Sequence, residues 1–304
     1  MNLLYLLEGI RFPALDQLML LVTRLGEETA FLVITLIVFW CVDKRKGYFL
    51  LSVGFLGTIG NQLLKLACRI PRPWVLDPEF TIVEQAREAA AGYSFPSGHT
   101  QTAVGTFGSL AYTEKKKGLK LLWILLMTLV AFSRMYLGVH TPADVLVGAA
   151  MALALIIGLQ PVVYGENSKG MKILLASMIA LSLVFLLYVE LWEFPADMDA
   201  HNLQSGYKNA YTMLGCTIGA AIVYLADTKK LNFPVKAVWW AQIIKVIVGL
   251  ALVLAVKEGL RAPLEWVFGG HMTARGVRYL LIVIVAGVLW PMTFGWFEKL
   301  GKNK

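Results

Sequence analysis

The sequence predicts an all-α fold, a polytopic bundle of transmembrane helices, and its composition is the first reason. Of 304 residues, 58% are hydrophobic and only 16% are charged, and the mean hydropathy is +0.65. A water-soluble domain carries roughly a quarter charged residues and about half apolar ones. The apolar residues also gather in stretches of roughly 17–23 residues, long enough for helices that cross a hydrocarbon core of about 30 Å. These observations exclude a disordered chain and a disulfide scaffold, and they indicate an integral membrane protein.

Hydropathy and chain breakers set the order of the elements. Residues 1–11 are short and amphipathic, which predicts an interfacial helix. The first crossing is the shortest and shares the tight Gly26-Glu27-Glu28 turn with the second. The short basic loop at 166–170 predicts a boundary between a six-helix core, residues 1–166, and a four-helix C-terminal extension, residues 167–304. We expect ten crossings, over 13–25, 28–43, 47–68, 97–114, 119–137, 142–165, 171–192, 208–227, 237–257 and 276–298.

The distribution of lysine and arginine predicts the orientation. Basic clusters at 44–46, 115–120, 169–172, 229–236 and 299–304 fall at every second turn of the chain. The positive-inside rule places such clusters, and with ten crossings both termini, on the cytoplasmic side. This placement accounts for the formal charge of +8 without a nucleic-acid partner. The other side receives the loops at 69–96, 138–141, 193–207 and 258–275.

The three cysteines, Cys41, Cys68 and Cys216, are far apart in the sequence. Their spacing matches neither a disulfide framework nor a metal site, and we predict no metal or other cofactor. The N-terminus has no basic region before its apolar run and carries Glu8. We therefore do not expect a cleaved signal peptide.

Three segments gather polar groups on one side of the membrane: Lys65 to Pro73, Phe95 to Thr100, and Ser133 to Asp144. Lys65, Arg72 and Arg134 have no neighbouring acid of comparable proximity in sequence. Cations at membrane depth are costly, and they indicate a functional site when no partner is evident. A phosphate would offset them, because arginine offers planar bidentate donors.

Ser97 and Gly98 open a predicted helix, whose backbone N–H groups and N-terminus make a further anion site. Gly98 also permits a close approach of the backbone. His99 and His140 supply one candidate nucleophile and one general acid near neutral pH.

Asp144 follows His140 by four residues, so it could orient the imidazole and leave the other ring nitrogen aimed at phosphorus. The alternative is a capping box, with Thr141 as N-cap and Pro142 at the first helical position. One residue can serve both purposes.

Each piece also has a plain structural interpretation. Lys65 could be a snorkelling helix end, residues 97–99 an ordinary helix start, and His140 a hydrogen-bonded core histidine. For Arg69 and Arg87 we expect solvated or headgroup-facing charges. Three cations and two histidines reaching one side together favour the functional interpretation.

Lys65-x6-Arg72-Pro73, Pro96-Ser97-Gly98-His99 and Ser133-Arg134-x5-His140-x3-Asp144 together resemble the three-part signature of the type 2 phosphatidic acid phosphatase superfamily. The resemblance covers residues 13–165 and says nothing of 167–304. It implies a metal-independent phosphatase of lipid phosphates or diphosphates that works through a phosphohistidine. It further implies a role for each motif residue: His140 as nucleophile, Asp144 as its orienter, His99 as general acid and then base, and Lys65, Arg72, Ser97, Gly98 and Arg134 as the phosphate-binding groups.

The predicted topology puts all three motifs near the outer membrane surface, within lateral reach of a lipid phosphate. The compact loops favour a bacterial cell membrane, where undecaprenyl diphosphate, phosphatidic acid and phosphatidylglycerol phosphate are the candidates. A phosphotransferase remains open, because the sequence shows no acceptor motif. A phospholipid transporter is disfavoured, because transporters carry their charges in symmetric halves and this chain shows no repeat.

The extension should shape lipid access, form a homodimer or cover the active site.

Lys245 should snorkel to the cytoplasmic face or, alternatively, pair inside the bundle. Trp239, Trp240 and Trp290 are expected to be interface anchors. Two charged groups should lie on the outer side: an acidic one, expected in a solvated loop with cation binding as the alternative (Glu190, Glu193, Asp197, Asp199, His201), and a mixed one (Lys257, Glu258, Arg261, Glu265, His271).

Overall fold

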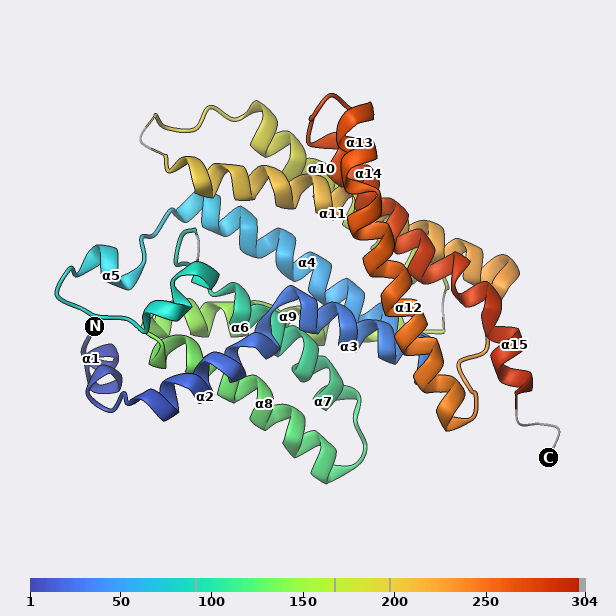
Figure 1. Cartoon of the computed structure of the whole chain (residues 1–304), viewed down its shortest axis with the longest axis horizontal. Coiled ribbons are helices and arrows are strands. Elements are labelled where there is room, and N and C mark those ends of the chain that lie inside the picture. Colours follow the sequence, from blue (N-terminus) through green and yellow to red (C-terminus); the bar gives the residue numbers. More distant parts are fainter. Residues whose placement is uncertain (91, 167, 197, 301–304) are drawn as a thin grey trace. The chain divides into compact units, whose positions relative to one another are not determined.

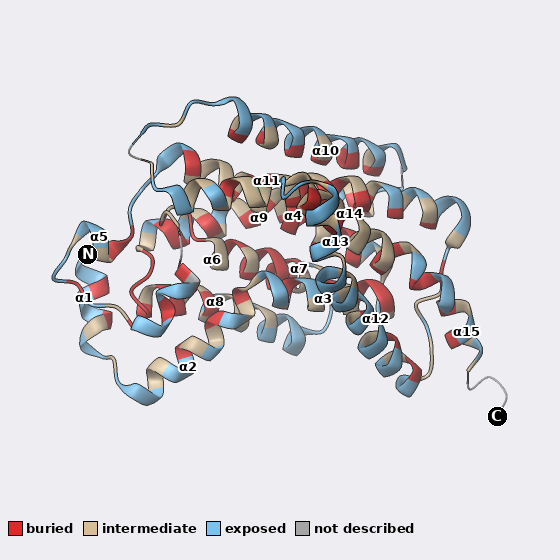
Figure 2. Cartoon of the chain, turned by 45° about the horizontal axis from the view of Figure 1, so that its top comes forward, coloured by how far each residue is buried: buried red, intermediate tan, exposed pale blue. Residues whose placement is uncertain are grey.

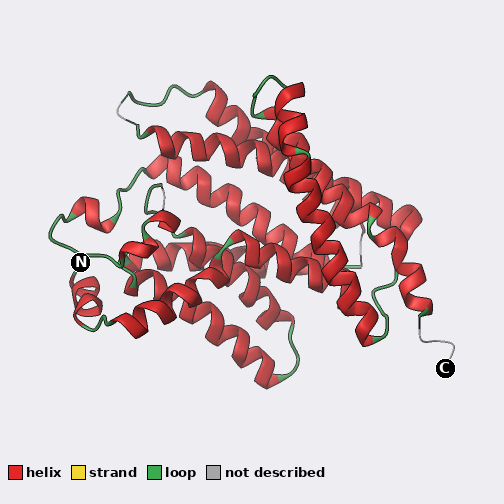
Figure 3. Cartoon of the chain, in the orientation of Figure 1, coloured by secondary structure: helices red, strands yellow, loops and turns green. Residues whose placement is uncertain are grey.

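The computed structural model describes residues 1–90, 92–166, 168–196 and 198–300, and within these ranges it consists of helices and loops without a strand (Figures 1 and 3). This confirms the all-α prediction. Seven helical segments of the described chain are long and apolar enough to cross a membrane. They are Lys44–Leu76, Lys117–Tyr136, Pro142–Tyr164, Ser168–Leu191, Ala200–Leu231, Trp239–Val267 and Thr273–Lys299.

Several of these helices offer apolar faces to lipid rather than to protein. In α8 (Lys117–Tyr136), 17% of the most apolar stretch is buried inside the protein, and in α9 (Pro142–Tyr164) the share is 22%. Figure 2 shows the alternation of buried and exposed residues along α10 (Ser168–Leu191). Exposed apolar helices of this length are suited to a bilayer, where every backbone polar group must be satisfied within the helix.

The expected first crossing over 13–25 is wrong as a spanning helix. α2 (Pro13–Thr23) has 11 residues and is therefore only about 16 Å long. A 3₁₀ turn, Arg24–Gly26, ends it. α3 (Glu28–Cys41) is apolar but has 14 residues. The expected crossing over 97–114 is divided into α6 (Gly98–Ala103), a π-helical turn (Val104–Gly108) and α7 (Ser109–Thr113).

By contacts, the chain separates into two compact units. The first contains residues 1–32, 52–161 and 194–206, and the second contains 33–51, 162–193 and 207–304. The predicted domain boundary falls at Asn167, which lies outside the described residues. The division into a core and an extension at that point stays a prediction.

Two glycines bring the elements of the first unit close to α6. At Gly26 a Cβ atom would lie 2.8 Å from the carbonyl oxygen of His99. At Gly148, on α9, a Cβ atom would lie 2.7 Å from the carbonyl oxygen of Ser97. Real Cβ atoms essentially never approach backbone so closely, so both positions require glycine. The start of α6 is thereby fixed between the turn before α3 and the first turns of α9.

The long loop at 69–96 is folded and packed. It contains α5 (Pro73–Leu76) and two 3₁₀ turns, Glu84–Ala86 and Glu88–Ala90. Its apolar side chains join the ends of α2 and α8 in one core cluster. The buried members of that cluster are Met19, Val83, Ala86, Ala90, Tyr136, Leu137 and Val139.

The N-terminal helix α1 (Asn2–Gly9) is bound to the same loop. Tyr5 donates its hydroxyl to Asp77 at 2.8 Å, and Thr81 donates both its amide and its hydroxyl to Glu8. Arg11 donates to the carbonyls of Thr81 and Tyr136, at 2.8 and 2.9 Å. These bonds hold the N-terminus at the end of the first unit that carries the 69–96 loop. The expected topology puts the N-terminus and this loop on opposite sides of the membrane, which these contacts do not fit. The membrane side of each stays a prediction.

In the second unit, two expectations are corrected. Lys245 of α12 (Trp239–Gly259) does not snorkel: it is fully buried, and its ammonium donates to the carbonyls of Trp40 and Val235 at 2.9 and 3.1 Å. The alternative of pairing inside the bundle is the one observed, with carbonyl oxygens as partners. Trp290 is not an interface anchor, because it is buried and donates to the Lys245 carbonyl at 3.1 Å.

Trp239 and Trp240 are 76% and 40% exposed, as expected for interface anchors. The rest of the second unit comprises α11 (Ala200–Ala226), the π turn Asp227–Leu231, α13 (Arg261–Val267), α14 (Thr273–Ile284), the turns Val285–Leu289 and Pro291–Thr293, and α15 (Phe294–Lys299). Residues 200–206 of α11 belong to the first unit. Within the acidic group, Asp197 lies outside the described residues.

Candidate active site

His140 and Asp144 form the centre of the candidate site, in the turn that joins α8 to α9. Gly138 adopts a left-handed φ of +80°, which lets the chain reverse directly after α8. Both His140 and Asp144 are almost fully buried, at 1% and 2% exposure. His140 Nδ1 lies 3.4 Å from Asp144 Oδ2. The predicted pairing of these two residues is therefore present in the structure.

Asp144 also caps α9. The same Oδ2 accepts the backbone N–H of Thr141 at 2.8 Å, while the Thr141 hydroxyl accepts the N–H of Asp144 at 3.3 Å. This reciprocal arrangement is a capping box. The two interpretations of Asp144 are both realised, because one carboxylate oxygen reaches the helix start and the imidazole together.

Arg72 contacts the imidazole as well: its Nη1 lies 3.4 Å from His140 Nδ1 and closer still to Nε2. Its Nη1 lies 2.9 Å from His140 Nε2 and also donates to the carbonyl of Val139 at 2.8 Å. A guanidinium can only donate, so Nε2 accepts with its lone pair. We assign the ring proton to Nδ1, which faces the carboxylate of Asp144. Nε2 is then the nitrogen available to an electrophile.

Arg134 supplies two donors that have no partner in the described part of the chain. The side chain is fully buried, and Nη1 donates to Thr23 Oγ1 at 2.7 Å. Its Nε and Nη2, and the Nε2 of His99, are buried and have no hydrogen-bond partner among the described residues. A buried polar group without a partner is costly, by about 1–3 kcal/mol and more when it is charged. An anion with several acceptor oxygens would satisfy these three atoms together.

The remaining predicted phosphate-binding residues surround the same place. Lys65, in the last turn of α4 (Lys44–Cys68), donates its ammonium to the carbonyl of Tyr93. Ser97 is the N-cap of α6: its hydroxyl accepts the N–H of Thr100 at 3.4 Å, and its own N–H donates to the Asp144 carbonyl at 3.0 Å. At Gly98 a Cβ would meet its nearest neighbour at an ordinary 3.7 Å. Protein packing therefore does not require glycine at this position.

Two buried residues of the site were not predicted from the sequence. Ser94 donates its hydroxyl to Asp144 Oδ2 at 2.5 Å and lies 3.5 Å from His140 Nδ1. Asn61, one helical turn before Lys65 on α4, donates to the Pro96 carbonyl at 3.4 Å, and its Oδ1 has no partner among the described residues. The available signals were a serine two residues before Pro96 and an asparagine four residues before Lys65 in an apolar helix.

The electrostatics of the site favour a neutral imidazole at His140. Burial lowers the pKa of His140 well below its ordinary value of 6.5, and the cations Arg72, Arg134 and Lys65 lower it further. The imidazole is then uncharged at neutral pH. A neutral imidazole is the form that can act as a nucleophile.

Arg69 and Arg87 are exposed charges, as the sequence predicts. Arg87 is exposed and forms a bidentate pair with Glu84, with both distances 2.7 Å. Arg69 is exposed as well, with a left-handed φ of 51°. In the described part of the chain, no three His, Cys, Asp or Glu side chains gather as a metal site would require. The three cysteines are free thiols.

The fold and this site define a class: an integral membrane protein with a buried His–Asp pair among cationic side chains that could bind an anion. In sequence, residues 45–167 match the PAP2 superfamily, and residues 211–303 match the transmembrane extension of PAP2 superfamily phosphatases. The chain belongs to the PAP2 superfamily, a class of phosphatases. The resemblance seen in the three motifs is thereby confirmed.

Curated relatives align with about half of the chain. A probable sphingosine-1-phosphate phosphatase of Dictyostelium discoideum is 33% identical over 50% of this chain and 39% of its own length. The undecaprenyl-diphosphatase BcrC of Bacillus subtilis is 31% identical over 47% of this chain and 72% of its own length. Phosphatidylglycerophosphatase B of Bacillus subtilis is 29% identical over 48% and 74%, respectively. No solved structure matches the chain at comparable significance.

Proposed function

We propose that this protein hydrolyses a lipid phosphate or diphosphate through a phosphohistidine intermediate, without a metal ion. The observation that carries the proposal is the contact series from Asp144 through His140 to Arg72. It leaves one imidazole nitrogen protonated toward a carboxylate and the other directed at a phosphate-binding guanidinium. The phosphatase names of the relatives support the same reaction class.

In the first half-reaction, the phosphoryl group of the lipid replaces His140 as the partner of Arg72. Nε2 of His140 forms a bond to phosphorus while the bond from phosphorus to the lipid oxygen breaks. His99 gives its proton to that leaving oxygen, since a bound dianion nearby favours the charged imidazolium beforehand. Arg134 and the N–H groups at the start of α6 hold the phosphoryl oxygens as charge shifts between them.

In the second half-reaction, His99 acts as a base. It takes a proton from water as the water oxygen attacks phosphorus and the P–N bond to His140 breaks. Inorganic phosphate leaves, and His140 returns to its neutral form. Asp144 stabilises the charge that develops on the imidazole in each step, through Nδ1.

The topology that fits the structure differs from the one expected from hydropathy. The basic loops at 44–46, 115–120 and 229–236 still point to the cytoplasmic side. The site, the 69–96 loop and α1 then face outward, while the C-terminus is cytoplasmic. This arrangement presents the cationic site to lipid headgroups of the outer leaflet. A bacterial cell membrane and a homodimer stay predictions.

The test is phosphate release in EDTA by detergent-purified protein. The substrates would be undecaprenyl diphosphate, phosphatidic acid, phosphatidylglycerol phosphate and sphingosine 1-phosphate. We expect release by the wild type, loss in His140→Ala, and full activity in the matched control His201→Ala, whose imidazole is exposed. A folded wild type that binds these lipids but releases no phosphate from any of them would contradict the proposal.

A second arm separates hydrolysis from transfer to an acceptor. Glycerol or a short-chain alcohol is added, and the phosphorylated products are counted against inorganic phosphate. Hydrolysis predicts that phosphate remains the main product. Transfer predicts a phosphorylated alcohol that increases with acceptor concentration at the expense of phosphate.

A further inference from the structure

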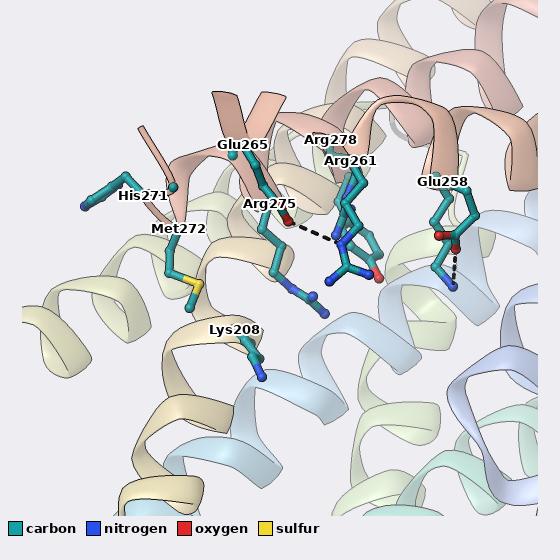
Figure 4. A pocket seen from close by; sticks show the side chains of 12 residues that line it. Lys208, Glu258, Arg261, Glu265, His271, Met272, Arg275 and Arg278 are labelled. Atoms are coloured by element: carbon teal, nitrogen blue, oxygen red, sulfur yellow. Dashed lines mark hydrogen bonds and ion pairs between the residues drawn. The ribbon is translucent and has the colours of Figure 1, made fainter. Parts of the chain in front are cut away.

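A polar cavity of about 530 Å³ lies in the second unit, and none of its lining residues belongs to the three motifs (Figure 4). It is bounded by the end of α12, by α13 and by the start of α14, with Lys208 of α11 at one side. Its lining is dominated by cationic side chains. Five contribute: Lys208, Lys257, Arg261, Arg275 and Arg278.

The carboxylates of the cavity do not balance this charge. Only two line it, and each lies near one cation: Glu258 is 3.6 Å from Lys257, and Glu265 is 3.3 Å from Arg261. Neither of these two acids is paired with Arg275 or Arg278. Arg275 donates to the neutral hydroxyl of Thr212 at 2.7 Å, which leaves its charge uncompensated.

Arg278 is the second observation that points to a ligand. The residue is only 8% exposed, and its Nε is buried without a hydrogen-bond partner among the described residues. Its guanidinium lies 5.9 Å from the centre of the Tyr279 ring. A buried guanidinium donor without an acceptor is costly. An anion in the cavity, which Arg278 lines, would satisfy it.

The chemistry of the lining selects phosphate among anions. Two arginines, Arg275 and Arg278, come from one turn of α14, and arginine matches phosphate oxygens with its planar fork of donors. A dianionic phosphate group carries more charge than a carboxylate or chloride and presents more acceptor oxygens than a carboxylate, so it can engage more of these donors at once.

The rim of the cavity places it at the depth of lipid headgroups. α13 has no buried residue, and its Trp266 and Val267 are 84% and 63% exposed. A short helix with an exposed tryptophan beside charged residues is typical of the membrane–water interface.

We propose that the cavity between α12, α13 and α14 is a second phosphate-binding site, which takes the phosphate group of an anionic membrane lipid. The proposal does not depend on the phosphatase reaction. It gives the transmembrane extension a ligand of its own.

The test counts binding sites for a soluble lipid, dihexanoyl phosphatidic acid, by calorimetric titration in detergent. His140→Ala is the background for every variant, so that the lipid is not consumed. We expect Arg275→Gln with Arg278→Gln to remove one site. If His140→Ala alone binds two lipids, the variant that also carries Arg275→Gln and Arg278→Gln should bind one, with unaltered affinity. If the active site of His140→Ala binds no lipid, the number of bound lipids should fall from one to zero.

Because Arg278 is buried, its substitution could also disturb folding. A second pair, Lys257→Gln with Arg261→Gln, changes exposed side chains only, and should weaken the same site on the order of tenfold. The matched control is Lys229→Gln with Lys230→Gln, two exposed cations in the π turn after α11, which should change neither number nor affinity. An unchanged site count and affinity in both cavity variants would overturn the proposal.

Two further titrations identify the source of the phosphate group. Inorganic phosphate should bind the cavity at least tenfold more weakly than the lipid, and dihexanoyl phosphatidylcholine should not compete. Equal binding of inorganic phosphate would assign the cavity to a soluble anion and overturn the lipid assignment. Equal competition by the zwitterionic lipid would overturn the requirement for an anionic headgroup.

Discussion

Asp144 Oδ2 lies 3.4 Å from His140 Nδ1 while it accepts the N–H of Thr141 at 2.8 Å, so one oxygen both orients the imidazole and caps α9. The position of the nucleophile is therefore tied to the start of a helix that continues for 23 residues. Rigid attachment of this kind limits the rotation of the ring, which favours a productive geometry.

The two roles of Asp144 can be separated by substitution. Asp144→Asn keeps a capping oxygen but loses the charge that stabilises the imidazolium, so we expect kcat to fall by about 10²–10⁴-fold with little change in stability. Asp144→Ala should lose the same activity and, in addition, about 1 kcal/mol of unfolding free energy. Phosphate release and thermal unfolding measure the two effects. An active Asp144→Asn enzyme would show that the carboxylate acts only as a cap.

Ser94 should act as a positioning residue through its bond to Asp144. Ser94→Ala removes a buried hydrogen bond to a carboxylate, worth roughly 1.5–3 kcal/mol. We expect kcat to fall by at least about tenfold with KM nearly constant, because the phosphate-binding groups are untouched. The matched control is Ser109→Ala, since the Ser109 hydroxyl is buried and has no partner in the described chain. A Ser94→Ala variant that changes KM alone would place the hydroxyl on the substrate.

The pH profile should report the cations around His140. Burial, Arg72 and Arg134 hold the pKa of His140 below 6.5, so its neutral form persists as the pH falls. Arg72→Gln removes one positive charge, which makes protonation easier and raises this pKa. We expect the acid limb of kcat/KM to move to higher pH in Arg72→Gln, whatever the loss in absolute rate. Because the substrate titrates identically in both enzymes, an unmoved limb would exclude His140 as the titrating group.

The sequence predicted which side chains gather at the candidate site better than it predicted the path of the chain. Lys65, Arg72, Ser97, His99, Arg134, His140 and Asp144 could be identified because cations and histidines are rare in apolar helices. Ser94 and Asn61 could not, because a serine in a loop and an asparagine in a helix are ordinary until their neighbours are known. The capping box was read directly from Thr141 to Asp144, since its pattern is local.

The errors share one physical cause, which is that hydropathy does not report tertiary contacts. Residues 13–25 are apolar enough for a crossing, yet α2 ends at Thr23, whose hydroxyl binds Arg134. The side chain of Lys245 is long enough to snorkel. Its ammonium instead donates to two buried carbonyls and lies 4.1 Å from the centre of the Phe294 ring. Trp290 is of the residue type that anchors helices at the membrane interface, but here it is buried and donates to the carbonyl of Lys245.

Lys245 should stabilise the second unit through the end of α3. The Trp40 carbonyl belongs to the last turn of that helix, where no backbone N–H follows to bind it, and Lys245 is its donor. Lys245→Met keeps the apolar stem but leaves this carbonyl unpaired, which should cost roughly 1–3 kcal/mol. Thermal unfolding in detergent measures the loss, with the exposed Lys236→Met as control. Equal unfolding temperatures for the two variants would show that the buried ammonium contributes nothing.

The side of the membrane on which the N-terminus lies distinguishes the structure from the hydropathy expectation. In a variant with Cys41, Cys68 and Cys216 changed to serine, a cysteine placed at Asn2 should react in intact cells with a membrane-impermeant maleimide. The reason is that α1 is bonded to Asp77 and Thr81 of the outward loop. A cysteine at Lys116, in the basic turn before α8, should react only after permeabilisation. If the cysteines at positions 2 and 116 react from the same side, the chain must cross the membrane between α1 and α3. If the cysteine at position 2 reacts only after permeabilisation, the 69–96 loop, which is bonded to α1, would lie in the cytoplasm as well.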